Sequence, residues 1–330
     1  MKLIKKIAGL ATIAVGAAAV SAAYAQDAEK YPQKPVHFIV AASAGGPSDV
    51  VARMVADKLS NRLGQPVIVE NRPGGGMVLG TAAVARAAPD GYTMLFTTST
   101  PIVMTPFTRK DLPYDVKKDF RIVAHVGVTP LVMYVNAATD IKNMNDLAEA
   151  ARAKDGSLPY GSYGVGSSAH VLTEYFSRQK DIKMIHVPYK GVSPQVQELA
   201  GGQITAAVAD IGVPKGLVQA GRIRPIAVTG DKRSSALPDI PTFAEQGVKG
   251  MEPFSPWWGV FAPVQTPDAI VQRVSKEVVE IVADPEIQKR MQELGIDPTG
   301  VGEKEAAKRL DDELERWKGI IASLSDISFE

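Results

Sequence analysis

The chain has 330 residues, of which 45% are hydrophobic and 22% charged, a composition typical of a globular protein and not of a disordered or fibrous one. Its 37 basic and 36 acidic residues give a net charge of +1, which supplies no overall basic field for a nucleic acid. The sequence contains no Cys, which excludes disulfides, thiolate metal sites and Cys nucleophiles. The length suffices for one large domain or two ordinary ones.

Residues 1–25 have the pattern of a secretory signal peptide. Three lysines at positions 2, 5 and 6 precede an apolar run over residues 7–20, and Ala23-Tyr24-Ala25 is an A-x-A cleavage site. A membrane anchor, the alternative, needs about 20 apolar residues. We expect cleavage after Ala25 and a periplasmic mature protein with 34 basic and 36 acidic residues, a net charge of −2. Without a Cys after this site, it would not be a lipoprotein.

The first half of the mature chain is expected to alternate strands and helices. Short β-branched or aromatic runs indicate buried strands, and apolar residues at i, i+3 and i+4 indicate helices. Glycine-rich loops separate them. The expected elements are a strand at 36–40, a loop at 41–46, a helix from 47 that stops at Gly64, a strand at 67–70, a loop at 71–76, a helix at 77–88 and a strand at 92–96.

The second half repeats this order of elements with little residue identity, and a helical tail follows. We expect strands at 131–135, 183–187 and 204–209, helices at 144–153 and 195–200, and a further helix after the Gly/Ser loop at 161–168. In the tail, Thr266 is expected to cap a helix that begins at Pro267 and runs to Ala283. Further helices are expected at 285–294 and 303–324.

This alternation predicts two α/β lobes, each a mostly parallel sheet flanked by helices. In such sheets, ligands bind beyond the carboxyl ends of the strands, where the Gly/Ser loops lie. We expect residues 26–124 and about 255–330 to form the first lobe and residues 125–254 the second, with the return crossing between 222 and 262. Trp257 and Trp258 could mark this return or simply belong to the core.

Two loops are candidates for binding an anion. Gly45-Gly46-Pro47-Ser48-Asp49 leads into a helix, whose first N–H groups and partial positive charge favour a carboxylate. The alternative is a simple turn in which Ser48 or Asp49 caps the helix. In the second loop, Ser167 and Ser168 could cap a helix, while Ser162 and the glycine N–H groups face the same cleft. Two helix starts suit a ligand with two anionic ends.

Other site chemistries receive less support. The 71–76 loop lacks the Gly-Lys-Ser/Thr of a phosphate loop, and Arg72 could supply a cation or brace the loop. The four histidines form no H-x-x-H pair, so no metal site is expected. His37 and His186 lie in strand patterns and are expected to be structural, and His170 could donate to a ligand or pack its loop.

A serine hydrolase is the alternative function. Ser168, His170 and Asp210 supply the residue types of a catalytic triad. However, the chain has no G-x-S-x-G nucleophile elbow. Loss of ester hydrolysis in Ser168→Ala would favour the hydrolase, and saturable binding without turnover would favour a receptor.

A series of motifs resembles the periplasmic solute-binding proteins of tripartite tricarboxylate transporters, the Bug family. The resemblance covers nearly the whole mature chain in order. The matching stretches are 45–49 with 52–53, 69–75, 88–93, 160–162, 164, 166–167 with 170, 187–191, 220–224, 227–229, 238–242 and 258–259.

The resemblance implies a two-lobed, type II-like "Venus flytrap" fold that holds a small organic carboxylate or dicarboxylate in its cleft. It implies no catalysis and no cofactor, and no nucleic-acid partner. The protein would be a monomer that delivers its ligand to integral-membrane transporter subunits or acts as an orphan sensor. The implied ligand-binding residues are Ser43, Ala44, Gly45, Gly46 and Ser48, with Thr97, Thr98 and Ser99, in the first lobe, and Ser162, Gly164, Gly166, Ser167, Ser168, His170, Tyr189 and Asp210 in the second.

The chain departs from the family pattern in its first loop. Relatives commonly carry an aromatic residue and Pro there, whereas this chain has Ala41-Ala42-Ser43-Ala44. Missing bulk would enlarge the pocket. We therefore expect a longer or aromatic carboxylate and not a compact amino acid such as aspartate.

Overall fold

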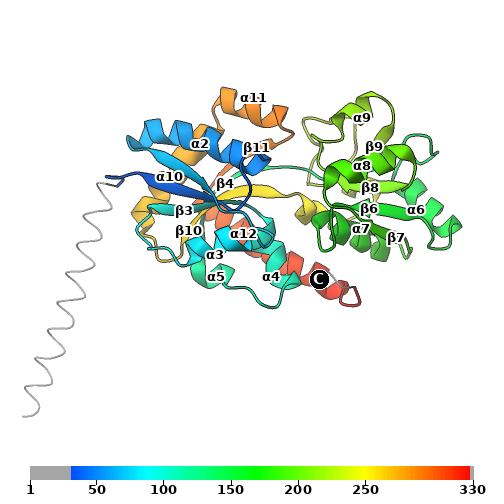
Figure 1. Ribbon diagram of the computed structural model, residues 1–330, viewed down its shortest axis with the longest axis horizontal. Coiled ribbons are helices and arrows are strands. Elements are labelled where there is room, and N and C mark those ends of the chain that lie inside the picture. Colours follow the sequence, from blue (N-terminus) through cyan, green and yellow to red (C-terminus); the bar gives the residue numbers. More distant parts are fainter. Residues whose placement is uncertain (1–30, 328–330) are drawn as a thin grey trace, which may run out of the picture.

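The computed structural model describes residues 31–327, so the expected signal peptide lies outside the described residues. Two α/β lobes lie side by side, one built on a six-stranded sheet and the other on a five-stranded sheet (Figure 1). Within residues 31–327, no helix combines the length and the apolar character needed to cross a membrane.

The sheet of the first lobe has the strand order β11-β4-β10-β3-β1-β2. β1 pairs in parallel with both β2 and β3, and it places Val36 opposite Val67 and His37 opposite Thr93. The strands are β1 (Val36–Val40), β2 (Val67–Asn71), β3 (Thr93–Thr98), β4 (Phe120–Val128), β10 (Trp257–Pro263) and β11 (Asp297–Gly302).

Helices cover both faces of this sheet. Phe38 and Phe96 pack with apolar residues of α2 (Pro47–Leu63) and α10 (Asp268–Val282) on one face. Ile39 and Leu95 pack with residues of α3 (Val78–Ala85) and α12 (Glu303–Ser323) on the other. The shorter elements are a π-helical turn, η1 (Thr100–Met104), and the helices α4 (Thr105–Thr108), α5 (Val116–Asp119) and α11 (Pro285–Glu293).

The sheet of the second lobe has the order β7-β6-β8-β5-β9. Its strands are β5 (Val132–Asn136), β6 (Pro159–Ser162), β7 (Ile185–Pro188), β8 (Ala206–Ala209) and β9 (Ile223–Val228). Its helices are α6 (Met144–Ala153), α7 (Ser168–Gln179), α8 (Val192–Gly201) and α9 (Lys215–Gln219), followed by the 3₁₀ turns η2 (Ala244–Gln246) and η3 (Glu252–Phe254).

The two-lobed α/β fold with flanking helices is confirmed, but both sheets are mixed and not mostly parallel. In each sheet, the strand that arrives from the other lobe inserts between two strands that both run antiparallel to it. β10 lies antiparallel between β3 and β4, and β5 lies antiparallel between β8 and β9. The sequence pattern reveals βαβ units within each lobe, whereas these two insertions depend on the path between lobes.

The chain crosses between the sheets twice. β4 leads directly into β5, and the return runs from the end of β9 to the start of β10. The two crossings lie side by side, because Thr129 N donates to Pro256 O (2.7 Å) and Thr229 N to Leu131 O (2.8 Å). β4 continues to Val128 in the first sheet, past the boundary expected after residue 124. We propose residues 129–131 and 229–256 as the crossing segments.

The expectation that Thr266 is the N-cap of the first tail helix, α10, is wrong. α10 begins at Asp268 with Pro267 as the N-cap, and no side chain caps it. The Thr266 hydroxyl is buried without a hydrogen-bond partner in the described residues. Pro267 has φ −55° and ψ 140°, so the chain enters the helix one residue later than expected.

Candidate functional site

The loop between β1 and α2 presents backbone groups at the end of a central strand. Ser43, Ala44 and Gly45 are exposed, and Gly45 adopts a left-handed φ of 79° that favours glycine. Gly46 is the N-cap of α2, and no side chain caps this helix. The first N–H groups of α2 therefore lack the side-chain acceptor that helix starts usually have.

The side chains that follow this loop brace it. Ser48 is 7% exposed, and its Oγ accepts a hydrogen bond of 2.9 Å from Trp258 Nε1. Asp49 accepts a hydrogen bond of 2.9 Å from Gly45 N, closing the turn. The alternative in which Ser48 or Asp49 caps α2 is not found, since neither side chain accepts a hydrogen bond from the first turn of the helix.

A network of polar side chains extends this bracing to β2. Asp49 Oδ1 lies 2.9 Å from Arg53 Nη2. The Arg53 guanidinium also donates to Asn71 Oδ1 (3.1 Å), and Asn71 Nδ2 donates to Ala42 O (3.1 Å). Burial alone would raise the pKa of Asp49, but the hydrogen bonds from Arg53, Gly45 and Asn71 lower it. The Asp49 carboxylate is thus an anionic brace within the loop.

The neighbouring 71–76 loop makes contacts within the first lobe. The exposed Arg72 guanidinium pairs with Glu70 at 3.0 Å, so it braces β2. Gly80 of α3 packs against this loop: a Cβ on Gly80 would lie 2.7 Å from Arg72 O and 2.8 Å from Ala41 Cα. Glycine therefore allows α3 to approach the start of the first-lobe loop.

The end of β3 contributes buried hydroxyls. Thr97 is 1% exposed, and its Oγ1 has no hydrogen-bond partner in the described residues. Thr98 donates to Met77 Sδ (3.2 Å). Ser99 N donates to Trp257 O (2.7 Å), and Ser99 Oγ accepts from Trp257 N (3.4 Å). Thr98 thus holds the side chain of Met77, and Ser99 hydrogen-bonds the end of β3 to the start of β10.

The second-lobe loop is held by its own hydroxyls. Ser162 has no exposed surface, and its Oγ lies 2.7 Å from His186 Nε2 and donates to Gly164 O (2.9 Å). Ser167 caps α7 as expected, accepting from His170 N (3.3 Å). Gly164 and Gly166 have φ of 145° and 67°. Between Ser162 and Ser167, Val165 is exposed and its neighbours are half-buried, so this stretch is the accessible part of the loop.

His170 and His186 form a stacked pair with ring centroids 3.7 Å apart. Gly166 N donates to His170 Nδ1 (3.2 Å). Burial, with a contribution from His186, lowers the pKa of His170 to about 4, and burial also lowers the pKa of His186. Both rings are therefore neutral at pH 7. These contacts match the loop-packing alternative for His170.

The hydrolase geometry finds no support here. Ser168 Oγ, 8% exposed as a residue, donates to Met104 Sδ at 3.9 Å. The Asp210 carboxylate accepts from Val213 N (3.0 Å). His170 Nδ1 is occupied by the Gly166 amide. A triad requires the acid to orient the histidine and the histidine to reach the serine.

The remaining predicted residues gather at one edge of the second sheet. Ser162 ends β6, Tyr189 follows β7 and Asp210 follows β8. These three strands run in the same direction, so their carboxyl ends share one edge. Tyr189 N donates to Ser162 O (2.8 Å), and both Tyr189 and Asp210 are half-buried.

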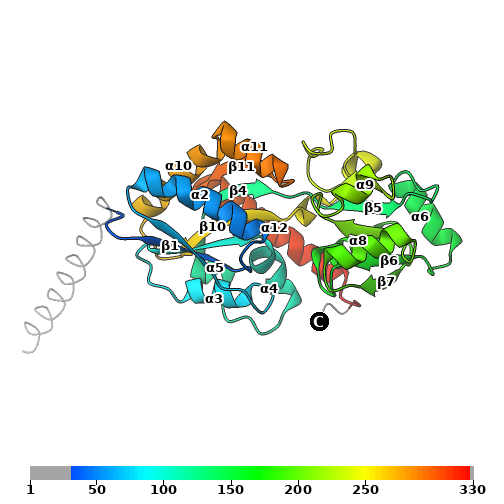
Figure 2. The same cartoon turned by 45° about the horizontal axis from the view of Figure 1, so that its top comes forward.

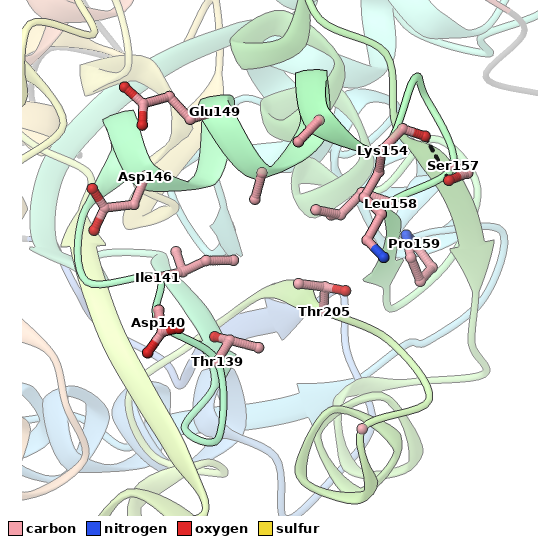
Figure 3. Close-up of a pocket in the computed structure, with 13 residues that line it drawn as sticks. Thr139, Asp140, Ile141, Asp146, Glu149, Lys154, Ser157, Leu158, Pro159 and Thr205 are labelled. Atoms are coloured by element: carbon pink, nitrogen blue, oxygen red, sulfur yellow. Dashed lines mark hydrogen bonds between the residues drawn. The ribbon is translucent and has the colours of Figure 1, made fainter.

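A separate groove of about 850 Å³ lies elsewhere on the second lobe (Figure 3). Leu158, Pro159 and Ile141 contribute apolar surface, and Asp146, Glu149 and Lys154 come from α6 and its end. It lies near the start of β6, the opposite end of that strand from Ser162, and none of the predicted site residues lines it. Sequence reasoning missed it, because no motif marks it.

Metal binding receives no support from residues 31–327, in which no group of three or more His, Cys, Asp or Glu side chains could hold an ion.

The molecule has two lobes joined by two crossings, and loops at the strand ends expose backbone groups. This is the arrangement of a solute-binding protein. A family model described as "Tripartite tricarboxylate transporter family receptor" matches residues 51–325. The chain belongs to this family.

Similar proteins include BugT of Bordetella pertussis, 32% identical over 94% of this chain and 96% of that protein. A solved structure titled as R. palustris Rpa4515 with adipate is 30% identical, with a TM-score of 0.76 over 89% of this chain and 98% of that one. MatC (Rpa3494) from Rhodopseudomonas palustris with bound malate is 26% identical, with a TM-score of 0.72 over 88% and 100%.

Proposed function

We propose that this chain captures a small organic carboxylate or dicarboxylate between its lobes. The observation that carries the proposal is the start of α2, where an exposed loop precedes a helix without a side-chain cap. α7 in turn begins against the first lobe, because Ser168 contacts Met104. We place the start of α2 at the same junction, where two helix starts would hold an anion at each end.

The relatives support this ligand class. One similar structure is described with adipate and another with malate, both dicarboxylates. With an expected net charge of −2, the overall charge of the mature protein would not attract an anion, and local groups such as backbone N–H groups would have to do so.

We assign the direct contacts to backbone groups of residues 43–46 and 163–167, with Tyr189 and Asp210 at the wall. The buried hydroxyls of Thr98, Ser99 and Ser162 would then position these segments from behind, since each has a protein partner. The buried Thr97 hydroxyl, which has no hydrogen-bond partner in the described residues, would be available to a ligand.

The ligand is longer or more aromatic than a compact amino acid. Ala42, Ser43 and Ala44 bring little bulk to the first-lobe loop, and Ala41 is already buried at 2% exposure. The space left by small side chains favours a ligand with a larger body.

Mass spectrometry of small molecules released from the purified protein tests the ligand class directly. Candidates are then titrated by calorimetry and thermal shift, where saturation at 100 times the dissociation constant stabilises the fold by about 2.7 kcal/mol. A screen in which only aspartate or glutamate stabilised the protein would overturn the size argument. A screen in which no carboxylate bound would overturn the function.

The protein would act without catalysis, as a periplasmic monomer cleaved after Ala25 and free of lipid. It would deliver its ligand to membrane transporter subunits or serve as a sensor. Intact-mass measurement of the secreted protein tests the cleavage site, and light scattering tests the monomer. Ester turnover lost in Ser168→Ala would overturn the non-enzymatic assignment.

A further inference from the structure

A further connection between the lobes lies beside the two crossings. β4 and β10, the first-lobe strands at which the crossings begin and end, are neighbours in the first sheet. β11 lies on the other side of β4, and its first residue, Asp297, pairs with Val128 at the end of β4. The end of α11, which precedes β11, faces the second lobe in both views (Figures 1 and 2). Asp297 therefore stands in line with the two crossings.

The Asp297 carboxylate binds two serines of the segment that returns from β9. Ser235 donates to Oδ1 through its Oγ (2.5 Å) and its backbone N (3.3 Å), and Ser234 Oγ donates to Oδ2 (3.2 Å). Ser234 is 2% exposed, and its Oγ also accepts from Ala236 N (3.3 Å). Both carboxylate oxygens are therefore engaged, and removing them would leave the buried Ser234 hydroxyl without its acceptor.

The segment that carries these serines is anchored on the second lobe, although it lies within the proposed crossing segment 229–256. Leu237 and Ile240 pack against a core cluster of the second lobe. Val228 N donates to Pro241 O (3.0 Å), which fastens the segment to the end of β9. Asp297 of the first lobe therefore binds a part of the chain that must move with the second lobe.

A second contact near Asp297 is apolar. Gly295 lies against Ile211, because a Cβ on Gly295 would lie 3.4 Å from Ile211 Cβ. Ile211 belongs to the same second-lobe cluster and follows Asp210, which we place at the wall of the ligand site. Apolar contacts have no preferred direction, whereas hydrogen bonds have a preferred distance and angle. The apolar surfaces can therefore slide, and the hydrogen bonds of Asp297 fix the position of the second lobe.

The number of connections determines which motions of the lobes are easy. Neighbouring strands of a sheet lie about 5 Å apart, so the two crossings are closely spaced. Two such points allow the lobes to bend about the line that joins them, and they resist twisting only weakly. The hydrogen bonds of Asp297 extend this line to a third strand, about 10 Å from β10. A longer line resists twisting more strongly and still allows bending.

We propose that Asp297 and the pair Ser234 and Ser235 form a third, non-covalent connection of the hinge, which suppresses twisting of the lobes and leaves them free to bend. This inference concerns the motion of the lobes and goes beyond ligand capture. A change in ligand affinity follows from it only if the proposed function also holds.

The absence of Cys permits a direct test in the whole mature protein without ligand. Cysteines replace Lys289 on α11 and Gln219 on α9, two exposed positions in different lobes, and carry nitroxide spin labels. Pulsed electron paramagnetic resonance measures the distribution of distances between the labels. We expect a broader distribution in Asp297→Ala than in the parent protein, because this variant removes every acceptor of the connection.

Further variants assign the effect. The double variant Ser234→Ala and Ser235→Ala removes both hydroxyl donors and should also broaden the distribution. Adding Asp297→Ala to it should give no further broadening, because the three side chains belong to one interaction. Glu293→Ala, which removes an exposed carboxylate at the end of α11, should keep the parent distribution. Circular dichroism establishes that each variant is folded, and the serine variant carries the test if Asp297→Ala does not fold.

The inference is overturned by an unchanged distribution in the folded Asp297→Ala or serine variant, by further broadening when the substitutions are combined, or by equal broadening in Glu293→Ala. Because no ligand is present, these outcomes are independent of whether the protein binds a carboxylate.

Discussion

Ser168 and Met104 join the two lobes by a contact between a hydroxyl and a thioether, with Oγ and Sδ 3.9 Å apart. Ser168 begins α7 of the second lobe, and Met104 ends a π-helical turn of the first. π-helical turns are rare and occur often at functional sites. This contact places the start of α7 at the lobe junction and engages the hydroxyl that a hydrolase would need.

Ser168→Ala should leave ligand affinity within a few-fold of the parent protein. A thioether sulfur is a weak acceptor, and a typical hydrogen bond contributes only about 1 kcal/mol. Calorimetric titration with the ligand identified by mass spectrometry measures the change. A complete loss of binding would show that the hydroxyl itself contacts the ligand.

Ser48→Ala should weaken ligand binding about fivefold, since it removes the acceptor for Trp258 Nε1 and leaves a buried indole N–H unpaired. The variant Ser48→Thr keeps an acceptor oxygen and serves as the matched control. Calorimetry measures both affinities. Equal affinity in Ser48→Ala and the parent would mean that Trp258 does not position the start of α2.

Gly80→Ala should destabilise the fold by about 1–3 kcal/mol, because the added Cβ would meet backbone atoms of Arg72 and Ala41 that cannot move independently. Gly319→Ala in α12 is the control, since a Cβ there meets nothing within 4 Å. It should stabilise the helix by about 0.5–1 kcal/mol. Urea unfolding measures both, and a neutral Gly80→Ala would contradict the close approach of α3.

The histidine pair should make the fold sensitive to acid. The pKa of His170 is lowered to about 4 in the folded protein from an ordinary value near 6.5, so the unfolded chain binds more protons between these values. The contribution of His170 to stability is therefore present above about pH 6.5 and lost as the pH falls toward 4.

The loss from His170 should amount to at most about 3 kcal/mol. Urea unfolding of the parent and of His170→Gln at about pH 7.5 and about pH 4.5 measures it. The variant should lose less stability on acidification than the parent. An equal loss in both proteins would assign the acid sensitivity to other groups, such as His125.

The elements within each lobe could be predicted from the sequence because their signals are local. The helix over residues 144–153 matches α6, and Gly64 ends α2 in a left-handed conformation with φ 72°. Gly/Ser loops at strand ends likewise indicated where a candidate site would lie. The antiparallel β10 and β5 could not be predicted, since their neighbours are set by contacts between distant segments.

The roles of individual hydroxyls also could not be predicted from the sequence. Ser48 and Ser162 stand in loops typical of ligand contacts, yet both side chains turn inward to Trp258 and His186. A hydroxyl at such a position can serve a ligand or a neighbouring ring equally well, and only the three-dimensional partner decides. Spacing alone gave no signal for Asp297, whose serine partners lie on a distant segment.

The insertion of β10 between β3 and β4 also bears on the order in which the chain folds. Thr98 can pair with Trp258 only after the whole second lobe has been synthesised. Until then, the first sheet lacks a central strand, and β3 and β4 are left without their shared neighbour. Pairing between such distant segments slows folding. The lobe that begins first along the chain is therefore the one whose sheet is completed last.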